Sequence, residues 1–402
     1  MEAESHSSYK ELFSIRNFLL MWTGQAVSYM GDQFHYIAIA GLLLYEHGVS
    51  AIEVGTFLVS MSAPSILIGP LAGVYVDRWN RKWVLITSDI IRGLLVMMIP
   101  FTTALWQIYV VMFLVSSVSR FFFPAYSSVI PNIVSKKQLL KANSLSQTTY
   151  NITLVLGPAA GAFVIGLFGY SLAFFINAAT FFFSALMILR VHLLEERKEV
   201  EGGVKEVIVQ MKEGLTLIRE KRPVLFVISV FSSIMFFIGG INVLLLVFVR
   251  DVLHLGIVQL GILEGFQGGG MILGALAVGI VGAKYEKRSL ILMGTFFVGF
   301  WLAIFGYNPS VIASYLLISV IGVFISVLTV PSNTLLQEVV PDEIRGRVFA
   351  VQGTLVQTFS IISIGWESAV ANVIGSQAMI IVVGVCCAGI GILGRLFPEF
   401  SS

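Results

Sequence analysis

Residues 69–85, GPLAGVYVDRWNRKWVL, decide how the rest of the chain is interpreted. The stretch begins as an apolar run in which Gly69 and Gly73 stand four residues apart. Two glycines at that spacing share one helix face, which lets a neighbouring helix approach closely in lipid. The run then meets four charged residues: Asp77, Arg78, Arg81 and Lys82. Because apolar residues resume at once, the stretch predicts a hairpin between two membrane-spanning helices.

The composition of the whole chain is that of a membrane protein. Of its 402 residues, 57% are hydrophobic and only 12% are charged, whereas about 25% are charged in a soluble domain. The net charge is +2, and the basic residues are scattered among short loops, so we expect no nucleic-acid partner. We expect a monomer whose partners are the lipid bilayer and a small molecule, with no metal site and no organic cofactor.

Apolar windows long enough to span a bilayer occur twelve times along the chain. Such a span needs about 20 mostly apolar residues. The windows lie near residues 17–44, 51–76, 83–104, 107–133, 146–168, 171–191, 223–249, 257–281, 289–306, 311–337, 349–372 and 376–397. Because twelve is an even number, both termini lie on the same side of the membrane.

The distribution of Lys and Arg predicts which side that is. Of the 25 basic residues, Arg250 is the one in a connection on the outer side, and Arg92 and Arg120 fall inside spans. All others lie in the termini and in the connections of the opposite side. Since cytoplasmic loops carry the excess of basic residues, we expect both termini in the cytoplasm of a cell with a bacterial-type inner membrane.

The longest polar connection, residues 193–222, divides the chain into two halves. We expect a cytoplasmic tail over 1–16, six-helix bundles over 17–192 and 223–397, and a short tail over 398–402. Within the connection, apolar residues recur at helical spacing opposite charged ones, which predicts an amphipathic helix on the inner membrane surface. A solvated linker is the alternative. The fold class expected is an all-α membrane protein made of two pseudo-symmetric bundles.

The hairpin resembles the loop between the second and third helices of major facilitator superfamily transporters, Gly-x-Leu-Ala-Asp-Arg-x-Gly-Arg-Lys. The residues that match are Gly73, Asp77, Arg78, Arg81 and Lys82; those that depart are Tyr75, Val76 and Asn80. The two halves also repeat at an offset of about 207 residues, so that PAYSSVIPNIVSKKQLLKANSL, from Pro124, lies over PSNTLLQEVVPDEIRGRVFAV, from Pro331. This resemblance implies parallel halves with a substrate site between them near the membrane midplane.

Ionisable residues inside spans are the candidate functional residues, because a charge in the bilayer interior is costly. Asp32 and His35 lie three residues apart on one face of the first span, with Gln25 two turns earlier. A carboxylate beside an imidazole in a low-dielectric cavity suits a proton that is exchanged in each cycle. The alternative is that Asp32 only bonds a neighbouring helix.

Two arginines lie inside the third and fourth spans. The resemblance to antiporters implies that Arg120, in the fourth span, is a fixed counter-charge, and we expect Asp32 to be its partner. Arg cannot lose its proton in a protein, so it must be paired or hydrated. Asp89 and Arg92, three residues apart in the third span, are expected to form a structural ion pair with the hairpin.

Two glutamates stand in spans of the second half. Glu264, with Gln267 on the same face, lies about two turns from the outer end of the eighth span, and Glu367 lies toward the outer end of the eleventh. Together with Asp32 they would place negative charge in the outer half of the molecule, where it attracts protons or cationic substrates. Alternatively, both glutamates are hydrated near the headgroups.

The charged end of the hairpin predicts a latch. Asp77 could accept hydrogen bonds from the first amides of the third span or from Arg81, in one conformational state alone. The alternative is a cluster that only sets topology. In span five, Gly157, Pro158 and Gly161 resemble the Gly-Pro-x-x-Gly-Gly motif of drug and proton antiporters, which implies a bend and a close helix contact.

Taken together, the chain resembles the bacterial drug-efflux branch of the superfamily, which includes macrolide and siderophore exporters. The resemblance implies a secondary transporter rather than an enzyme, with the proton as coupling ion and a small amphipathic compound as the cargo. Two alternatives stay open: a proton- or sodium-coupled uptake transporter of a metabolite, and a membrane receptor or scaffold that transports nothing. No Walker sequence occurs, so ATP is not the expected energy source.

Overall fold

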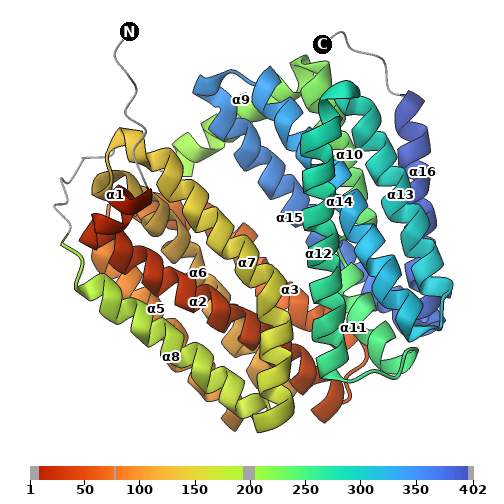
Figure 1. The fold of residues 1–402 in the computed structure, drawn as a ribbon, viewed down its shortest axis with the longest axis horizontal. Coiled ribbons are helices and arrows are strands. Elements are labelled where there is room, and N and C mark those ends of the chain that lie inside the picture. Colours follow the sequence, from red (N-terminus) through yellow and green to blue (C-terminus); the bar gives the residue numbers. More distant parts are fainter. Residues whose placement is uncertain (1–8, 77, 193–203, 397–402) are drawn as a thin grey trace. The chain divides into compact units, whose positions relative to one another are not determined.

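The computed structural model describes residues 9–76, 78–192 and 204–396 (Figure 1). All regular elements in these ranges are helices, and no strand occurs among them. The part before residue 193 contains α1 (Tyr9–Ser14), α2 (Arg16–Gly41), η1 (Leu42–Glu46), α3 (Ala51–Leu67), α4 (Gly69–Val76), α5 (Arg81–Met98), η2 (Ile99–Phe101), α6 (Leu105–Ile133), α7 (Lys136–Phe168) and α8 (Tyr170–Leu189).

The part after residue 203 continues in the same way. It contains α9 (Val204–Glu220), α10 (Arg222–Ile238), α11 (Ile241–Asp251), α12 (Ile257–Val281), η3 (Gly282–Lys284), α13 (Lys287–Tyr307), α14 (Val311–Val339), α15 (Asp342–Ile374), α16 (Ser376–Leu393) and η4 (Gly394–Leu396). Among the four short η elements, η1 is a π-helical turn and the others are 3₁₀ turns.

Ten helices in the described ranges are long and apolar enough to cross a bilayer. Of the twelve expected spans, the first two fall outside that group. The first, α2, has 26 residues but carries the polar side chains of Gln25, Asp32 and His35. The second is divided into α3, with 17 residues, and α4. With these two, the helices account for the twelve spans of the predicted all-helical fold.

The first compact unit consists of Met1–Gly41 and Ala63–Val204. Inside it α2 packs on α7 and α8, α5 packs on α6 and α8, and α4 packs on α6. Figure 1 shows α2, α5 and α8 running side by side. The contact between α2 and α8 is close: a Cβ built on Gly31 would lie only 2.2 Å from Thr180 Oγ1. Small residues allow such an approach where lipid provides no hydrophobic drive.

The second compact unit consists of Leu42–Ser62 and Lys205–Ser402, and its helices repeat the neighbour pattern of the first unit. Here α10 packs on α15 and α16, α13 packs on α14 and α16, and α12 packs on α14. Each of these pairs is the counterpart, six spans later, of a pair in the first unit. The repeated pattern confirms the two related bundles that the sequence predicts.

The segment Leu42–Ser62 differs from the sequence-based division, which grouped it with the first bundle over 17–192. Its contacts place it in the second unit, because η1 packs on α11 and a Cβ on Gly55 of α3 would lie 2.2 Å from Ser368 Oγ. The first span therefore passes from one unit into the other between Gly41 and Leu42.

The charged hairpin has a structural role at its second helix. Asn80, rather than an acid, caps α5, since its side chain accepts a hydrogen bond from the Trp83 N–H at 3.0 Å. Lys82 Nζ donates to the carbonyl of Leu189, the last residue of α8, at 2.9 Å and to that of Val191, two residues later, at 2.7 Å. Asp77 lies outside the described residues, so its expected role as a latch stays a prediction.

Two further details concern the hairpin motif. Gly69 begins α4, and a Cβ built on it would meet no described atom within 4 Å. The expected close helix contact at Gly69 is therefore wrong. In the second unit, Arg288 occupies the position equivalent to Lys82, and its Nη2 donates to the Arg395 carbonyl at 3.3 Å. In each unit a basic residue thus holds the end of the last helix.

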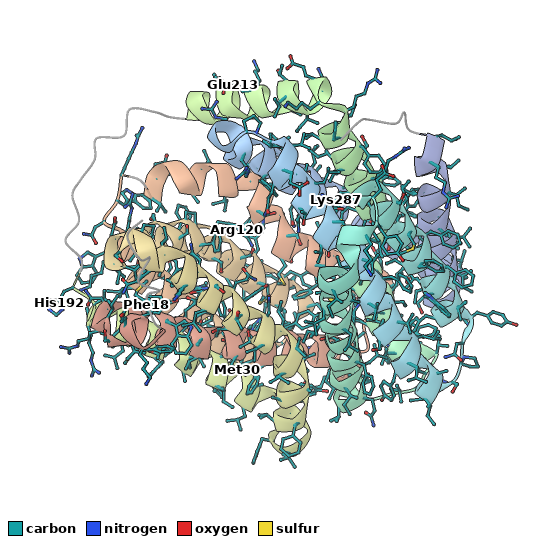
Figure 2. The ribbon with its side chains drawn as sticks, turned by 45° about the horizontal axis from the view of Figure 1, so that its top comes forward. Phe18, Met30, Arg120, His192, Glu213 and Lys287 are labelled. Atoms are coloured by element: carbon teal, nitrogen blue, oxygen red, sulfur yellow. The ribbon has the colours of Figure 1, made fainter. Side chains whose placement is uncertain are left out.

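The connection between the halves contains the predicted helix, α9. Ile218 is buried in the core of the second unit, and Glu213 forms an ion pair with Arg347 of α15. Glu213 is labelled on α9 in Figure 2. The helix is therefore fastened to the second unit at its C-terminal half.

Candidate functional site

The first unit contains a buried ion pair between Asp89 and Arg92 of α5. Asp89 is fully buried, and Arg92 is 6% exposed. The Arg92 guanidinium lies between the rings of Phe122, on α6, and Phe181, on α8, with 4.4 Å from Cζ to each ring centroid. Cation–π contacts of this kind stabilise a desolvated guanidinium. The expected ion pair is present, but its surroundings are α6 and α8 rather than the hairpin.

Asp32 of α2 belongs to the same charge cluster. Asp89 and Arg92 both act on its carboxyl group electrostatically, and the Asn177 amide of α8 faces it. Tyr29, one turn earlier on α2, is close enough to Asp32 and Arg92 for its hydroxyl group to interact electrostatically with both. We call Asp32, Asp89 and Arg92 the charge cluster. It holds two carboxyl groups and one guanidinium, so one negative charge has no cation to balance it within the cluster.

Two expected pairings of Asp32 are wrong. His35 is buried one turn after Asp32 on α2, but its side chain contacts other groups: its Nε2 lies 3.2 Å from Met112 Sδ, and its ring centroid lies 5.4 Å from that of Phe174. Arg120, labelled in Figure 2, forms no ion pair with Asp32, and its Nε has no hydrogen-bond partner in the described chain. The cation that acts on Asp32 is Arg92. Neither His35 nor Arg120 is the partner of Asp32, because tertiary packing places other groups beside it. Residue spacing along α2 could not reveal that packing.

Gln25 is buried on α2, and its Oε1 lacks a hydrogen-bond partner among the described residues. The Gln25 side chain lies beside Tyr29, whose ring packs edge-on against Tyr150 of α7 with 5.1 Å between centroids. Gln25 therefore extends the polar surroundings of the charge cluster along α2, and its expected place in a coupling or substrate cavity stays a prediction.

The second unit contains a break in span seven, between α10 and α11 at Gly239 and Gly240. In an unbroken helix the Gly240 N–H would donate to the Phe236 carbonyl. Instead it donates to Ser363 Oγ at 3.2 Å, and the Trp366 Nε1 donates to the Phe236 oxygen at 3.1 Å. Two side chains of α15 therefore hold both partners of the missing helical bond.

Glu367 lies one turn after Ser363 on α15 and has no exposed surface. The Ser363 hydroxyl donates to Glu367 Oε1, so that Gly240, Ser363 and Glu367 form one hydrogen-bonded chain. The other oxygen, Oε2, has no hydrogen-bond partner among the described residues, and a Cβ on Gly240 would lie 2.8 Å from it. The alternative of a glutamate hydrated near the headgroups is therefore wrong for Glu367.

The remaining candidates lie elsewhere in their units. Glu264 and Gln267 are partly buried on α12, and the backbone of Gln267 packs against Gly322 of α14. In span five, a Cβ on Gly157 would lie 2.5 Å from the Gln33 side chain, and one on Gly161 would lie 3.0 Å from the Phe34 Cα. The close contact implied by the span-five motif is therefore made with α2; Pro158 lies inside α7.

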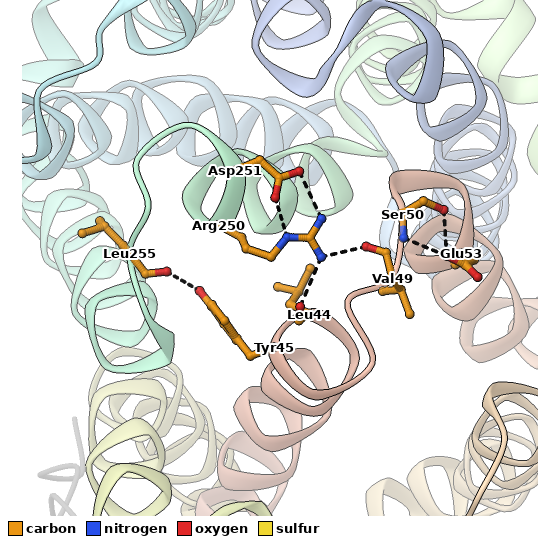
Figure 3. Close-up of polar contacts among 8 residues, drawn as sticks. All are labelled: Leu44, Tyr45, Val49, Ser50, Glu53, Arg250, Asp251 and Leu255. Carbon is orange, nitrogen blue, oxygen red and sulfur yellow. Dashed lines mark hydrogen bonds and ion pairs between the residues drawn. The ribbon is translucent and has the colours of Figure 1, made fainter.

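A clamp at the start of the second unit holds the segment that follows α2 (Figure 3). Arg250 Nη1 donates to the carbonyls of Leu44 at 3.2 Å and Val49 at 2.8 Å. The Tyr45 hydroxyl donates to the Leu255 carbonyl at 2.5 Å. We call Arg250 and Tyr45 with their three carbonyl partners the outer clamp. Arg250 is the one basic residue that the sequence places outside, and its partners are backbone groups that sequence patterns do not report.

Sequence reasoning missed several residues of these sites. Asn177 and Tyr29 complete the surroundings of Asp32, while Ser363 and Trp366 hold the break at Gly240. Polar residues in otherwise apolar spans were a usable signal for Asn177 and Ser363. The Gly239–Gly240 pair inside span seven was a signal for a helix break.

The fold and the buried ionisable residues describe a polytopic membrane transporter built from two related helical bundles. The family model of the Major Facilitator Superfamily matches residues 21–365, and the chain belongs to that family. The structure of the nucleoside transporter NupG has the same fold, with a TM-score of 0.76 and 15% identity over 96% of this chain and 100% of that one.

Relatives of similar length are found among bacterial efflux proteins and transporters. The chain is 27% identical to Macrolide efflux protein A of Streptococcus pyogenes over 397 residues, which cover 94% of this chain and 97% of that protein. It is 25% identical to the uncharacterized MFS-type transporter YfiS of Bacillus subtilis over 393 residues, which cover 94% and 92%. The chain is thus a multi-pass membrane transporter with relatives named for efflux.

Proposed function

We propose that this transporter exports small amphipathic compounds in exchange for protons. The observation that carries the proposal is the composition of the charge cluster: Asp32, Asp89 and Arg92 leave one carboxyl group without a balancing cation. A buried charge without a partner is costly. One of the two carboxyl groups must therefore bind a proton or another cation, and can release it when the site opens to the other side.

The direction of transport is supported by the relatives and by the span-five motif. Macrolide efflux protein A matches nearly the whole chain, and the Gly157 and Gly161 contact with α2 is the close packing that the antiporter motif implies. The cytoplasmic location of both termini rests on the basic residues of the connections. Protons would then enter the cell as the cargo leaves.

The test is transport of the macrolide erythromycin into proteoliposomes with an imposed pH gradient. An acidic lumen should drive erythromycin inward beyond its accumulation in protein-free liposomes, because protons leave through the protein in exchange. Asp32→Asn should abolish this gradient-driven part while erythromycin binding stays measurable. Glu338→Gln, which breaks the surface ion pair with Lys287, is the matched control and should transport as the wild type does.

Other outcomes would favour other functions. Protein-dependent uptake driven only by an acidic exterior would indicate inward movement together with protons. Binding that no gradient converts into movement would indicate a receptor. Full gradient-driven transport by Asp32→Asn would remove Asp32 from the coupling mechanism.

A further inference from the structure

The break in span seven is linked by hydrogen bonds to the buried carboxyl group of Glu367 on α15. Ser363 and Trp366 replace the helical bond between Gly240 and Phe236, and Glu367 accepts the Ser363 hydroxyl bond. Discontinuous spans place helix ends near the bilayer midplane, where they can bind ions. The N-terminal end of α11, which has 11 residues, begins directly after Gly240.

No cation balances Glu367 among the described residues. The helices α10 and α11 present Phe236 and Gly240 to this part of α15. On the other sides, α16 presents the thiol of Cys387, and α3 presents Gly55 beside Ser368. None of these groups is a Lys, Arg or His. A fully buried carboxylate ion with such neighbours is strongly disfavoured over the neutral acid.

We propose that Glu367 is a proton-binding site that controls the break in span seven. The proton binds Oε2, the carboxyl oxygen that has no partner, and converts the carboxylate into a neutral acid. The inference deepens the proposed proton-coupled function by adding a second site, in the second unit, with a conformational consequence. It does not require that the charge cluster of the first unit be the coupling site.

The two protonation states make different demands on the break. As a neutral acid, Glu367 fits the closed arrangement of the structure, with the Gly240 amide bound to Ser363. As an ion, the carboxylate needs additional donors, and the nearest are water and the free amides at the start of α11, where the helix dipole is positive. Loss of the proton therefore favours an opened break in which the backbone around Gly240 is more accessible.

Hydrogen–deuterium exchange of the segment 236–245 in the full-length protein, in detergent micelles, tests this inference. If opening releases one proton, the opening constant increases about tenfold per pH unit. The exchange rate of this segment should therefore rise more steeply with pH in the wild type than in Glu367→Gln. The additional increase in the wild type should be about tenfold per pH unit. The Gln side chain keeps the size of the neutral acid but cannot release a proton.

Matched variants separate the site from general stability. Glu338→Gln removes a surface carboxyl group and should keep the pH dependence of the wild type. Ser363→Ala should raise exchange at all pH values, because the Gly240 amide loses its acceptor, while the steeper pH dependence remains. Equal pH dependence in the wild type and Glu367→Gln would overturn the inference. Protection that follows Na⁺ concentration instead of pH would also overturn it, in favour of a metal-cation site.

The experiment uses neither substrate nor membrane gradient. Its outcome is therefore separate from the erythromycin flux test. Transport that proves independent of protons, combined with a pH-dependent break, would refute the proposed coupling and leave the site at Glu367 standing. The reverse result would refute the site alone.

Discussion

Arg92 shows how one residue holds together the polar interior of the first unit. Its guanidinium pairs with Asp89, lies between two phenylalanine rings and acts on Asp32. Arg is suited to this position because its planar, delocalised group stacks on aromatic faces and always keeps its charge. The residue therefore stabilises the bundle and sets the charge balance of the proposed coupling site.

Arg92→Ala is expected to destabilise the protein by about 3–5 kcal/mol, because removing one partner leaves the buried Asp89 without its counter-charge. The measurement is the free energy of unfolding, obtained from a denaturant titration of the protein in mixed micelles. The matched control is Arg347→Ala, which breaks the exposed ion pair with Glu213 and should change the stability by no more than about 1 kcal/mol. Equal effects of the two variants would contradict this account of Arg92.

At the residue scale the sequence predicted which side chains matter better than it predicted their partners. Asp32, Arg92 and Glu367 were found because an ionisable residue in an apolar span is conspicuous. The partner of Asp32 was assigned to His35 and Arg120 from spacing and resemblance, and neither contact exists. Spacing along one helix fixes a direction from its axis, but which neighbouring helix lies in that direction depends on tertiary packing.

At the scale of elements, the outer clamp determines where the end of the first span belongs. Arg250 donates hydrogen bonds to two backbone carbonyls, one in η1 and one just after it. The element η1 is a π-helical turn. Such turns are rare in proteins, and those that occur are often found at functional sites. The apolar window at residues 17–44 located the span but did not show that its last turn leaves one unit for the other. Every residue has a backbone carbonyl, so the sequence does not show which carbonyls accept hydrogen bonds from Arg250.

Arg250→Ala is expected to release this turn, since each hydrogen bond from a charged donor contributes about 1.5–3 kcal/mol. Hydrogen exchange of residues 43–50 should accelerate at least about tenfold, while exchange in α13 and α16 stays unchanged. Arg250→Lys should give an intermediate effect, because an ammonium group lacks the planar fork that spans both carbonyls. Unchanged exchange in Arg250→Ala would show that Tyr45 alone holds the turn.

At the scale of the whole molecule, the same neighbour pattern occurs in both units. Lys82 and Arg288, 206 residues apart, bind the carbonyls at the end of the last helix of their own unit. This separation agrees with the offset of about 207 residues at which the two halves of the sequence repeat. The structure supplies its physical reason, because helix ends leave carbonyls that need donors. The basic residues of the hairpin thus stabilise each bundle as well as setting its topology.

Leu42–Ser62 belongs to the second unit although it lies in the N-terminal half of the chain. The C-terminal half therefore needs a segment of the N-terminal half to complete its own unit. A polypeptide of residues 204–402 produced alone would lack a structural piece of its own bundle, whereas co-production with residues 1–192 would restore that piece in trans. We expect the C-terminal fragment to be degraded when made alone and to be rescued by the N-terminal one, as pulse-chase labelling in cells can measure. Arg250→Ala in the C-terminal fragment should weaken that rescue. Equal half-lives of the C-terminal fragment with and without its complement would show that the borrowed segment is dispensable.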